Sequence, residues 1–281
     1  MATHYTIDPL RQALADGSPP EWASGWGEDR YGLFLAFTLK GVTQQLRWIP
    51  PGSFMMGSPT DEPERFDNEG PQHEVTFRQG FWMFDTACTQ GLWQAVMGDN
   101  PSYFQSPDLP VEQVSWDDVQ GFLARINAQI PGLALSLPSE AQWEYACRAG
   151  TTTPFSFGDN ITPEQVNYDG TFPYANGPKG LNRQKTVPVA SLPPNPWGLF
   201  EMHGNVFEWC EDVWHDSYQQ APTDGRAWID AQSAPHSGVV RVVRGGSWIR
   251  DARLVRAAYR YALSPGGRSH DFGFRCSRVH S

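Results

Sequence analysis

Apolar and polar positions first fall into a regular pattern in residues 33–39 and 44–49. Both runs are rich in Leu, Phe, Ile and Trp, and Gly41 stands between them, which is typical of a β-hairpin. Residues 50–58 follow as a turn and a short strand. Residues 60–69 are too polar for a core element, so we expect a surface loop there.

Three later segments have apolar residues at the spacing of amphipathic helices. The first covers residues 89–97. The second begins at Ser115 and the third at Ser139, and a carboxylate or amide side chain three positions after each serine completes a capping box. We expect the third helix to end at Gly150, because glycine is preferred just after a helix C-terminus.

The pattern becomes irregular in residues 151–240, which contain many Gly, Pro and Asn but few helical spacings. Within this stretch residues 186–189 are a short strand candidate. Strands are predicted again near residues 239–244 and 272–278. At the start of the chain, residues 6–15 have the composition of a short helix.

The composition favours a loop-rich α+β fold over a helical bundle, because the 281 residues include 12 Trp, 27 Gly and 24 Pro. No internal repeat or linker divides the chain. We therefore predict one main domain over residues 46–281, with a lead-in and hairpin over residues 1–45 packed on it.

The chain has a net charge of −10 and a low isoelectric point, near 5.1. This negative charge repels phosphate backbones, so we expect no nucleic-acid partner. The start of the chain has no basic stretch followed by an apolar one, which predicts no signal peptide. No window approaches the roughly 18 apolar residues of a membrane span. These features predict a cytoplasmic protein without a membrane partner.

The four cysteines are far apart and form no CxxC pair; they are Cys88, Cys147, Cys210 and Cys276. Without an export signal, cysteines of this kind are expected to be free, buried thiols, and a disulfide is the alternative. The seven histidines show no HxH or HxxxH spacing, so a metal site of three histidines would have to be assembled by the fold.

Six phrases, read in order, resemble the formylglycine-generating-enzyme (sulfatase-modifying factor) family over roughly residues 46–279. They are IPPGSFMMGS from Ile49, PVEQVSWD from Pro110, LPSEAQWEYA from Leu137, PNPWGLFEMHGNVFEW from Pro194, RGGSW from Arg244 and GFR from Gly273. The resemblance implies a C-type-lectin-like fold with little regular secondary structure, in agreement with the loop-rich composition.

The resemblance also defines where the family's oxidase chemistry would lie. In the oxidases, the Arg-Gly-Gly-Ser phrase is followed by two cysteines that bind copper(I). Those positions hold Arg250 and Val255, and neither side chain can ligate copper. We therefore expect no copper and no such oxidase activity, and an enzyme of other chemistry is the alternative.

Members of the family often carry structural calcium, which the resemblance places in the irregular region. Asn167, and Asn205 together with Glu208, match the relevant motifs and offer oxygen ligands. The alternative for the two asparagines is hydrogen bonding to neighbouring backbone.

The C-terminal segment, residues 244–275, alternates two kinds of position. Residues that match the family motifs are separated by twelve that follow no scaffold rule. These twelve are Ile249, Arg250, Asp251, Leu254, Tyr261, Ala262, Leu263, Ser264, Ser269, His270, Asp271 and Phe272.

This layout resembles the variable proteins of diversity-generating retroelements, which randomise adenines near the 3′ end of a gene that encodes a lectin-like fold. The resulting NNC codons cannot encode Glu, Lys, Gln, Met or Trp, and none of these residue types occurs among the twelve. With typical usage, the chance of that absence is about one in twenty. The resemblance implies a non-catalytic protein with a variable face for a protein or other macromolecular ligand. An enzyme and a structural or regulatory binding module are the alternatives.

If this interpretation holds, the twelve positions form one solvent-accessible patch, because loops on a rigid scaffold carry binding residues. The glycine pairs 245–246 and 266–267 permit turns that bring residues 249–254 beside residues 261–272. In that arrangement we expect the family arginines Arg253, Arg256 and Arg268 to point inward and bind loop carbonyls.

Overall fold

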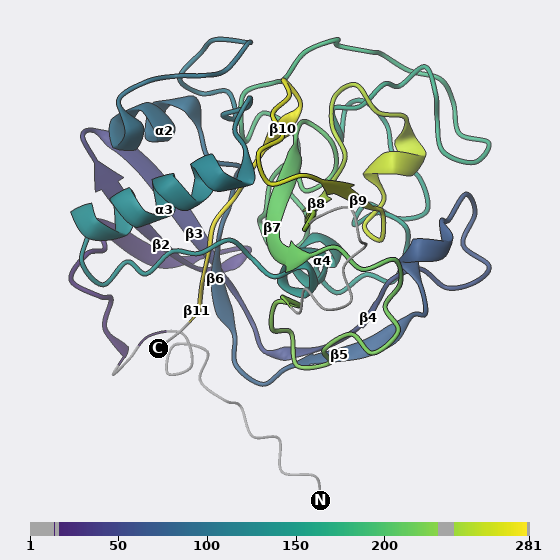
Figure 1. Cartoon of the computed structure of the whole chain (residues 1–281), viewed down its shortest axis with the longest axis horizontal. Coiled ribbons are helices and arrows are strands. Elements are labelled where there is room, and N and C mark those ends of the chain that lie inside the picture. Colours follow the sequence, from purple (N-terminus) through teal and green to yellow (C-terminus); the bar gives the residue numbers. More distant parts are fainter. Residues whose placement is uncertain (1–13, 15–16, 230–238, 280–281) are drawn as a thin grey trace, which may run out of the picture.

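The computed structural model describes residues 14, 17–229 and 239–279, and Figure 1 shows the arrangement of its elements. The helix predicted over residues 6–15 lies outside the described residues, apart from Leu14, which is buried. Within the described ranges, every helix is too short or too polar to cross a membrane.

A five-stranded antiparallel sheet has the order β1-β2-β3-β6-β11. Its strands are β1 (Gly25–Asp29), β2 (Gly32–Leu39), β3 (Val42–Ile49), β6 (Phe81–Phe84) and β11 (Ser277–Val279). The pairing of β2 with β3 confirms the predicted hairpin. β1 has no counterpart among the predicted strands, because its sequence GWGED lacks an apolar alternation.

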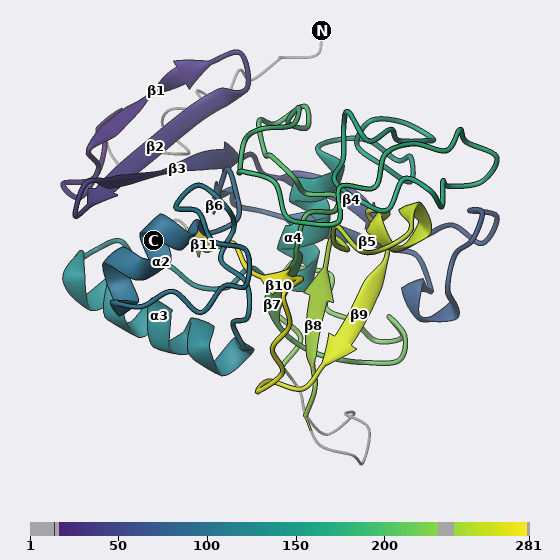
Figure 2. The same ribbon diagram turned by 90° about the horizontal axis from the view of Figure 1, so that it is seen from above.

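Two helices, α2 (Gln90–Met97) and α3 (Trp116–Gln129), lie side by side, and α2 packs against β2 and β3 (Figures 1 and 2). Trp93 of α2 stacks on Phe122 of α3 with ring centroids 5.5 Å apart. Both helices begin where the sequence predicts, because the side chains of Thr89 and Ser115 accept hydrogen bonds from backbone amides in the first turn.

The third predicted helix, α4 (Glu140–Arg148), is buried along its whole length. Its capping box is present: Ser139 Oγ accepts from the Gln142 amide at 3.0 Å, and Gln142 Oε1 accepts from the Ser139 amide at 2.9 Å. Left-handed backbone at Ala149 and Gly150 ends the helix at the expected place.

A second sheet has the order β10-β7-β8-β9, and β4 (Gly52–Met56) pairs with β5 (His73–Phe77) in a separate hairpin. The members of the second sheet are β7 (Phe207–Val213), β8 (Arg241–Arg244), β9 (Arg260–Leu263) and β10 (Phe272–Gly273). β8 confirms the strand predicted near residues 239–244.

Two strand predictions need correction. Residues 186–189 form no strand, and the strand predicted over residues 272–278 divides into β10 and β11, which belong to different sheets. Residues 149–206 contain only isolated bridges outside their turns, in agreement with the predicted irregular region.

The polar stretch over residues 60–69 is not simply a surface loop. It contains the short helix η2 (Asp67–Glu69), and Glu62 and Glu69 are buried. Both carboxylates bind Arg256, with nitrogen–oxygen distances of 2.5 to 2.8 Å. A buried carboxylate requires such a partner, and the partner lies too far away in the sequence to be recognised from the local pattern.

Arg256 is one of four completely buried arginines in the C-terminal segment. Each contacts a buried carboxylate: Arg244 binds Glu144, Arg256 binds Glu62 and Glu69, Arg260 binds Glu140, and Arg275 binds Glu208. Arg244 also donates to three consecutive carbonyl oxygens, those of residues 257–259, at 2.6 to 2.9 Å. These contacts attach the C-terminal segment to the rest of the molecule.

We predict that Arg256→Met destabilises the protein by about 3–5 kcal/mol, because it leaves two buried carboxylates without a partner. Arg253→Met is the matched control. Arg253 is exposed, pairs with Asp251 at the surface and lies over the Phe66 ring, so its loss is expected to cost about 1 kcal/mol. Urea unfolding of both variants checks the difference, and equal losses would contradict the assignment of Arg256 as an anchor.

Candidate ligand-binding face

The C-terminal segment runs from β8 through a tight turn, the short helix η4 (Ala252–Val255), β9 and β10. The turn depends on Gly246, whose φ is +69°. A Cβ atom there would lie 2.3 Å from the carbonyl oxygen of Leu254, so only glycine allows η4 to pack this closely. In Figure 2, β8 and β9 lie side by side, with the segment that follows β9 at one end of them.

Ten of the twelve predicted positions keep solvent-accessible surface. The most exposed are Ile249, Tyr261 and Ser264, and the half-buried ones are Arg250, Asp251, Leu254, Ala262, Leu263, Ser269 and His270. We call these ten residues the face. They come from the turn after β8, from η4 and its start, from β9, and from the loop before β10.

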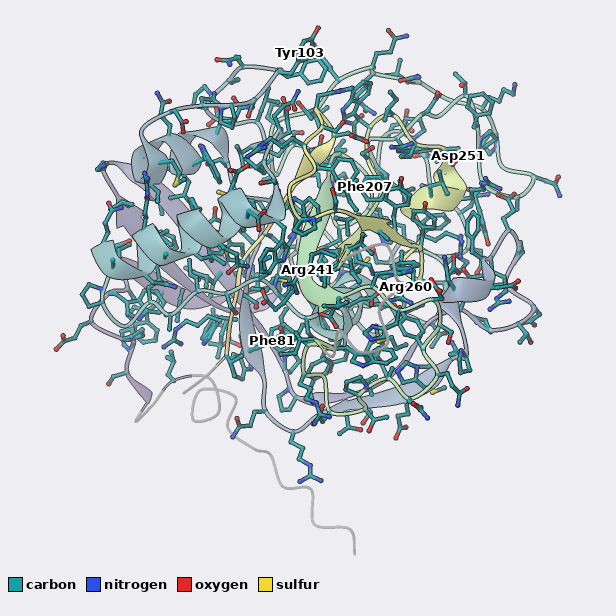
Figure 3. The ribbon with its side chains drawn as sticks, in the orientation of Figure 1. Phe81, Tyr103, Phe207, Arg241, Asp251 and Arg260 are labelled. Atoms are coloured by element: carbon teal, nitrogen blue, oxygen red, sulfur yellow. The ribbon has the colours of Figure 1, made fainter. Side chains whose placement is uncertain are left out.

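Phe207 of β7 lies beneath the face and contacts two of its residues. This buried ring lies 5.9 Å from the ring of Tyr261, and the Arg250 guanidinium carbon lies 5.6 Å from its centroid. In a second contact between these parts of the chain, the ring centroids of Trp248 and His270 are 5.3 Å apart. Residues 249–254 therefore lie beside residues 261–272, as predicted. The labels of Phe207 and Asp251 locate this region in Figure 3.

Asp271 and Phe272 are buried, so the prediction that they point outward is wrong. Phe272 stacks on Phe207 at 5.1 Å and belongs to the hydrophobic core. The Asp271 carboxylate accepts hydrogen bonds from Ser269 Oγ at 2.6 Å and Ser247 Oγ at 3.0 Å, and Arg250 lies 3.4 Å away. A buried carboxylate in these contacts supports the face from beneath.

The prediction that three family arginines point inward is right for Arg256 and wrong for Arg253 and Arg268, which are exposed. Arg268 makes two hydrogen bonds to Asp118, of 2.7 and 2.8 Å. Arg253 lies 3.4 Å from Asp251. The exposed arginines therefore form ion pairs at the surface, where a guanidinium remains hydrated at little cost.

The side chains of Asn167, Asn205 and Glu208, predicted as calcium ligands, contact other protein groups in the structure. Glu208 binds Arg275 through both carboxylate oxygens, at 2.6 and 2.8 Å. Asn205 Oδ1 accepts from the Val187 amide at 2.9 Å and from Asn167 at 3.1 Å. Among these three side chains, the buried Asn167 Oδ1 is the oxygen without a hydrogen-bond partner, and calcium at this place stays a prediction. The contacts correspond to the alternative expectation, hydrogen bonding to backbone.

The two positions that hold copper ligands in the oxidases differ in environment. Val255 is completely buried, and Arg250 is half-buried beside Asp271. In the described part of the chain, no three His, Cys, Asp or Glu side chains are grouped as metal ligands.

The four cysteines are free and buried, as predicted. Burial raises the pKa of each thiol, which keeps it protonated and a poor nucleophile. His203 is also buried, and burial lowers its pKa to about 4. Its Nδ1 lies 2.7 Å from the Val255 carbonyl oxygen, and its Nε2 accepts from the Ser156 amide. These contacts give the neutral imidazole a structural position.

Tyr103 borders the face, and buried Glu112 lies near Asp271; the sequence predicts neither as a site residue. Tyr103 lies 6.0 Å from His270, ring to ring, and no local pattern identifies it. Glu112 belongs to the PVEQVSWD phrase and is completely buried. Its Oε1 accepts from the Phe104 amide at 2.8 Å, and its Oε2 has no partner. Burial, together with nearby Asp271, raises the pKa of Glu112 to about 7.

The fold and the anchored C-terminal segment define a C-type-lectin-like protein of the formylglycine-generating-enzyme class. The chain belongs to the family of the sulfatase-modifying factor enzyme 1-like domain, whose family model matches residues 37–280. This match confirms the family resemblance that the sequence phrases indicate.

Three proteins illustrate the similarity. The chain is 29% identical over 296 residues to the formylglycine-generating enzyme of Mus musculus, covering 83% of this chain and 74% of that one. Its fold is similar to PvdO from Pseudomonas aeruginosa, with a TM-score of 0.73, 29% identity and coverage of 93% and 100%. It is also similar to Treponema denticola variable protein 1, with a TM-score of 0.70, 26% identity and coverage of 88% and 99%. Among the first curated relatives, the chain spans between 24% and 74% of their length.

We predict that Glu112→Gln makes the protein more stable relative to the wild type as the pH rises. Because its folded pKa is raised to about 7, Glu112 stabilises the fold below the unfolded pKa, and this contribution is lost as pH rises through 7. The stability of the variant minus that of the wild type is expected to rise by about 1–3 kcal/mol between about pH 5 and pH 8.5.

Urea unfolding at the two pH values measures this change. Exposed Glu28 provides the control, and Glu28→Gln is expected to leave the difference constant within about 0.5 kcal/mol. If the stability difference between Glu112→Gln and the wild type is the same at both pH values, this carboxyl has the same pKa in the folded and unfolded chains and the prediction is wrong.

Proposed function

We propose that the chain is a non-catalytic ligand-binding protein that displays a variable C-terminal face on a C-type-lectin-like scaffold, as the variable proteins of diversity-generating retroelements do. One observation carries the proposal: buried arginines anchor the segment, and ten intervening positions remain accessible. Substitution at such positions alters recognition while the backbone stays in place.

The similarity to Treponema denticola variable protein 1 supports this proposal, because it extends over 88% of this chain. The residue types of the face add support. The ten positions still contain no Glu, Lys, Gln, Met or Trp after Asp271 and Phe272 are set aside, as expected for NNC codons. The ligand is a protein or another macromolecule, and neither nucleic acid nor a membrane is a partner in this proposal.

The composition of the face is suited to protein recognition. Ile249, Leu254 and Tyr261 supply apolar contact area, and Arg250, Asp251 and His270 supply polar contacts. Apolar and aromatic anchors bordered by polar groups are typical of protein interfaces. Binding of this kind requires no catalytic group.

An enzyme of the formylglycine-generating-enzyme family is the second candidate, favoured by the similarity to the mouse enzyme. Arg250 and Val255 weigh against its copper chemistry, because neither is a ligand for copper(I). Titration with copper(I) under reducing conditions, with an aldehyde assay on a sulfatase-type peptide, separates the candidates. Stoichiometric binding with turnover would favour the enzyme.

We predict that the genome of the source contains a near-copy of the 3′ end of this gene, close to a reverse-transcriptase gene. In that copy, adenines are expected at the codons of the ten face positions, because adenines are the bases that such elements randomise. Sequencing the flanking DNA measures this directly. A flanking region with neither the copy nor the reverse transcriptase would contradict the retroelement proposal.

A further inference from the structure

Large exposed apolar side chains gather at the face and beside it. Tyr103 is 70% exposed and Phe172 is 62% exposed, compared with 45% for Ile249 and 41% for Tyr261. Tyr103 and Phe172 come from loops outside the C-terminal segment. Large apolar side chains exposed to solvent in one region are candidates for an interaction site.

Tyr103 is held against the face by a well-connected turn. Besides its contact with His270, its ring lies 5.0 Å from the ring of Phe104, which in turn lies 5.6 Å from Trp248. The same turn is fixed by Glu112, whose Oε1 accepts from the Phe104 amide. The backbone of this turn is therefore held by a contact that does not involve residue 270. Figure 3 labels Tyr103 at the upper edge of the view.

Phe172 borders the face at a second place, where backbone hydrogen bonds fix it. The amide of Ala252 donates to the Phe172 carbonyl oxygen at 3.1 Å, and the amide of Asp169 donates to the Arg250 carbonyl oxygen at 2.8 Å. Leu181, 58% exposed, lies beside this turn through a backbone contact with Gly170. These bonds use no face side chain, so substitutions in the face leave them in place.

The charges at the face are already compensated within the molecule. Arg250 lies 3.4 Å from Asp271, Arg253 lies 3.4 Å from Asp251, and Arg268 binds Asp118 at 2.7 Å. These three arginines and their three aspartate partners have no net charge together, although the whole chain carries −10. A partner gains little from a charged contact area here, whereas an apolar one gains from burying exposed rings.

We infer that Tyr103 and Phe172 are constant anchors of the ligand-binding face, and that the face with its present residues takes an apolar, electrically neutral patch on a protein surface. The inference rests on the proposed function, since it concerns the same face. The C-terminal positions then set specificity, and the two constant rings contribute contact area to every complex.

The experiment uses the full chain displayed on yeast. Arg250 and Asp251 keep their natural residues, and the other eight face positions are randomised among the uncharged residues Ser, Tyr, Asn and Ile. Binders are selected separately on two defined proteins, streptavidin and hen lysozyme. In purified binders, Tyr103→Ser and Phe172→Ser are made together, and Trp26→Ser is the matched control, because Trp26 is 50% exposed on β1.

The double substitution is expected to raise the Kd at least about tenfold for binders of either target, while Trp26→Ser changes it less than about twofold. The Kd is also expected to change less than about threefold between 50 and 500 mM salt. Thermal melts of the unbound variants verify folding, and single substitutions replace the double one if it unfolds the chain.

Three outcomes distinguish the inference from the proposed function. Binders whose Kd is unaffected by losing both rings would overturn the anchor role and leave the proposed function standing. A Kd that weakens more than about tenfold with salt would overturn the neutral, apolar partner. A folded library that yields no binder to either target would overturn the proposed function and the inference with it.

Discussion

The C-terminal segment depends on four arginines whose guanidinium groups are buried: Arg244, Arg256, Arg260 and Arg275. Burial of a guanidinium is costly unless a carboxylate and further acceptors satisfy it. Each of these four has a buried carboxylate partner and at least one backbone carbonyl. The five donors of arginine make one side chain sufficient to hold several loop carbonyls at once.

This arrangement separates what holds the segment from what the segment presents. The partners lie on the scaffold: Glu140 and Glu144 on the buried helix α4, Glu208 on β7, and Glu62 and Glu69 in the polar loop. None of these contacts uses a side chain of the face. The same scaffold serves relatives named as enzymes and one named as a variable protein, which agrees with the principle that function lies in the site and not in the fold.

The sequence was sufficient for features that local physics determines. The hairpin of β2 and β3 follows from apolar runs around Gly41, and the starts of α3 and α4 follow from capping serines. The family phrases supplied the fold class. Most of the face also followed, because its positions fall between the phrases that match the scaffold.

The errors arise where a distant partner decides the environment. Glu62 and Glu69 are acidic residues in a polar stretch, and only contact with Arg256 explains their burial. β7 contains charged residues that are buried because partners such as Arg275 cover them. Phe272 is buried because Phe207 lies beneath it. Spacing along the chain contains no information about such contacts.

Replacing Ile249, Arg250, Asp251, Tyr261 and His270 with serine in one variant tests the central claim most directly, because it removes presented side chains and leaves every buried arginine in place. Ser264 and Ser269 are already serine, and Leu254, Ala262 and Leu263 stay unchanged because they pack against the hydrophobic core. Urea unfolding of this variant and of the wild type measures the free energy of unfolding. The account predicts cooperative unfolding with a loss of no more than about 2 kcal/mol, the sum of small surface effects. A variant that fails to fold, or that loses most of its stability, would show that the face holds the segment together and would contradict the account.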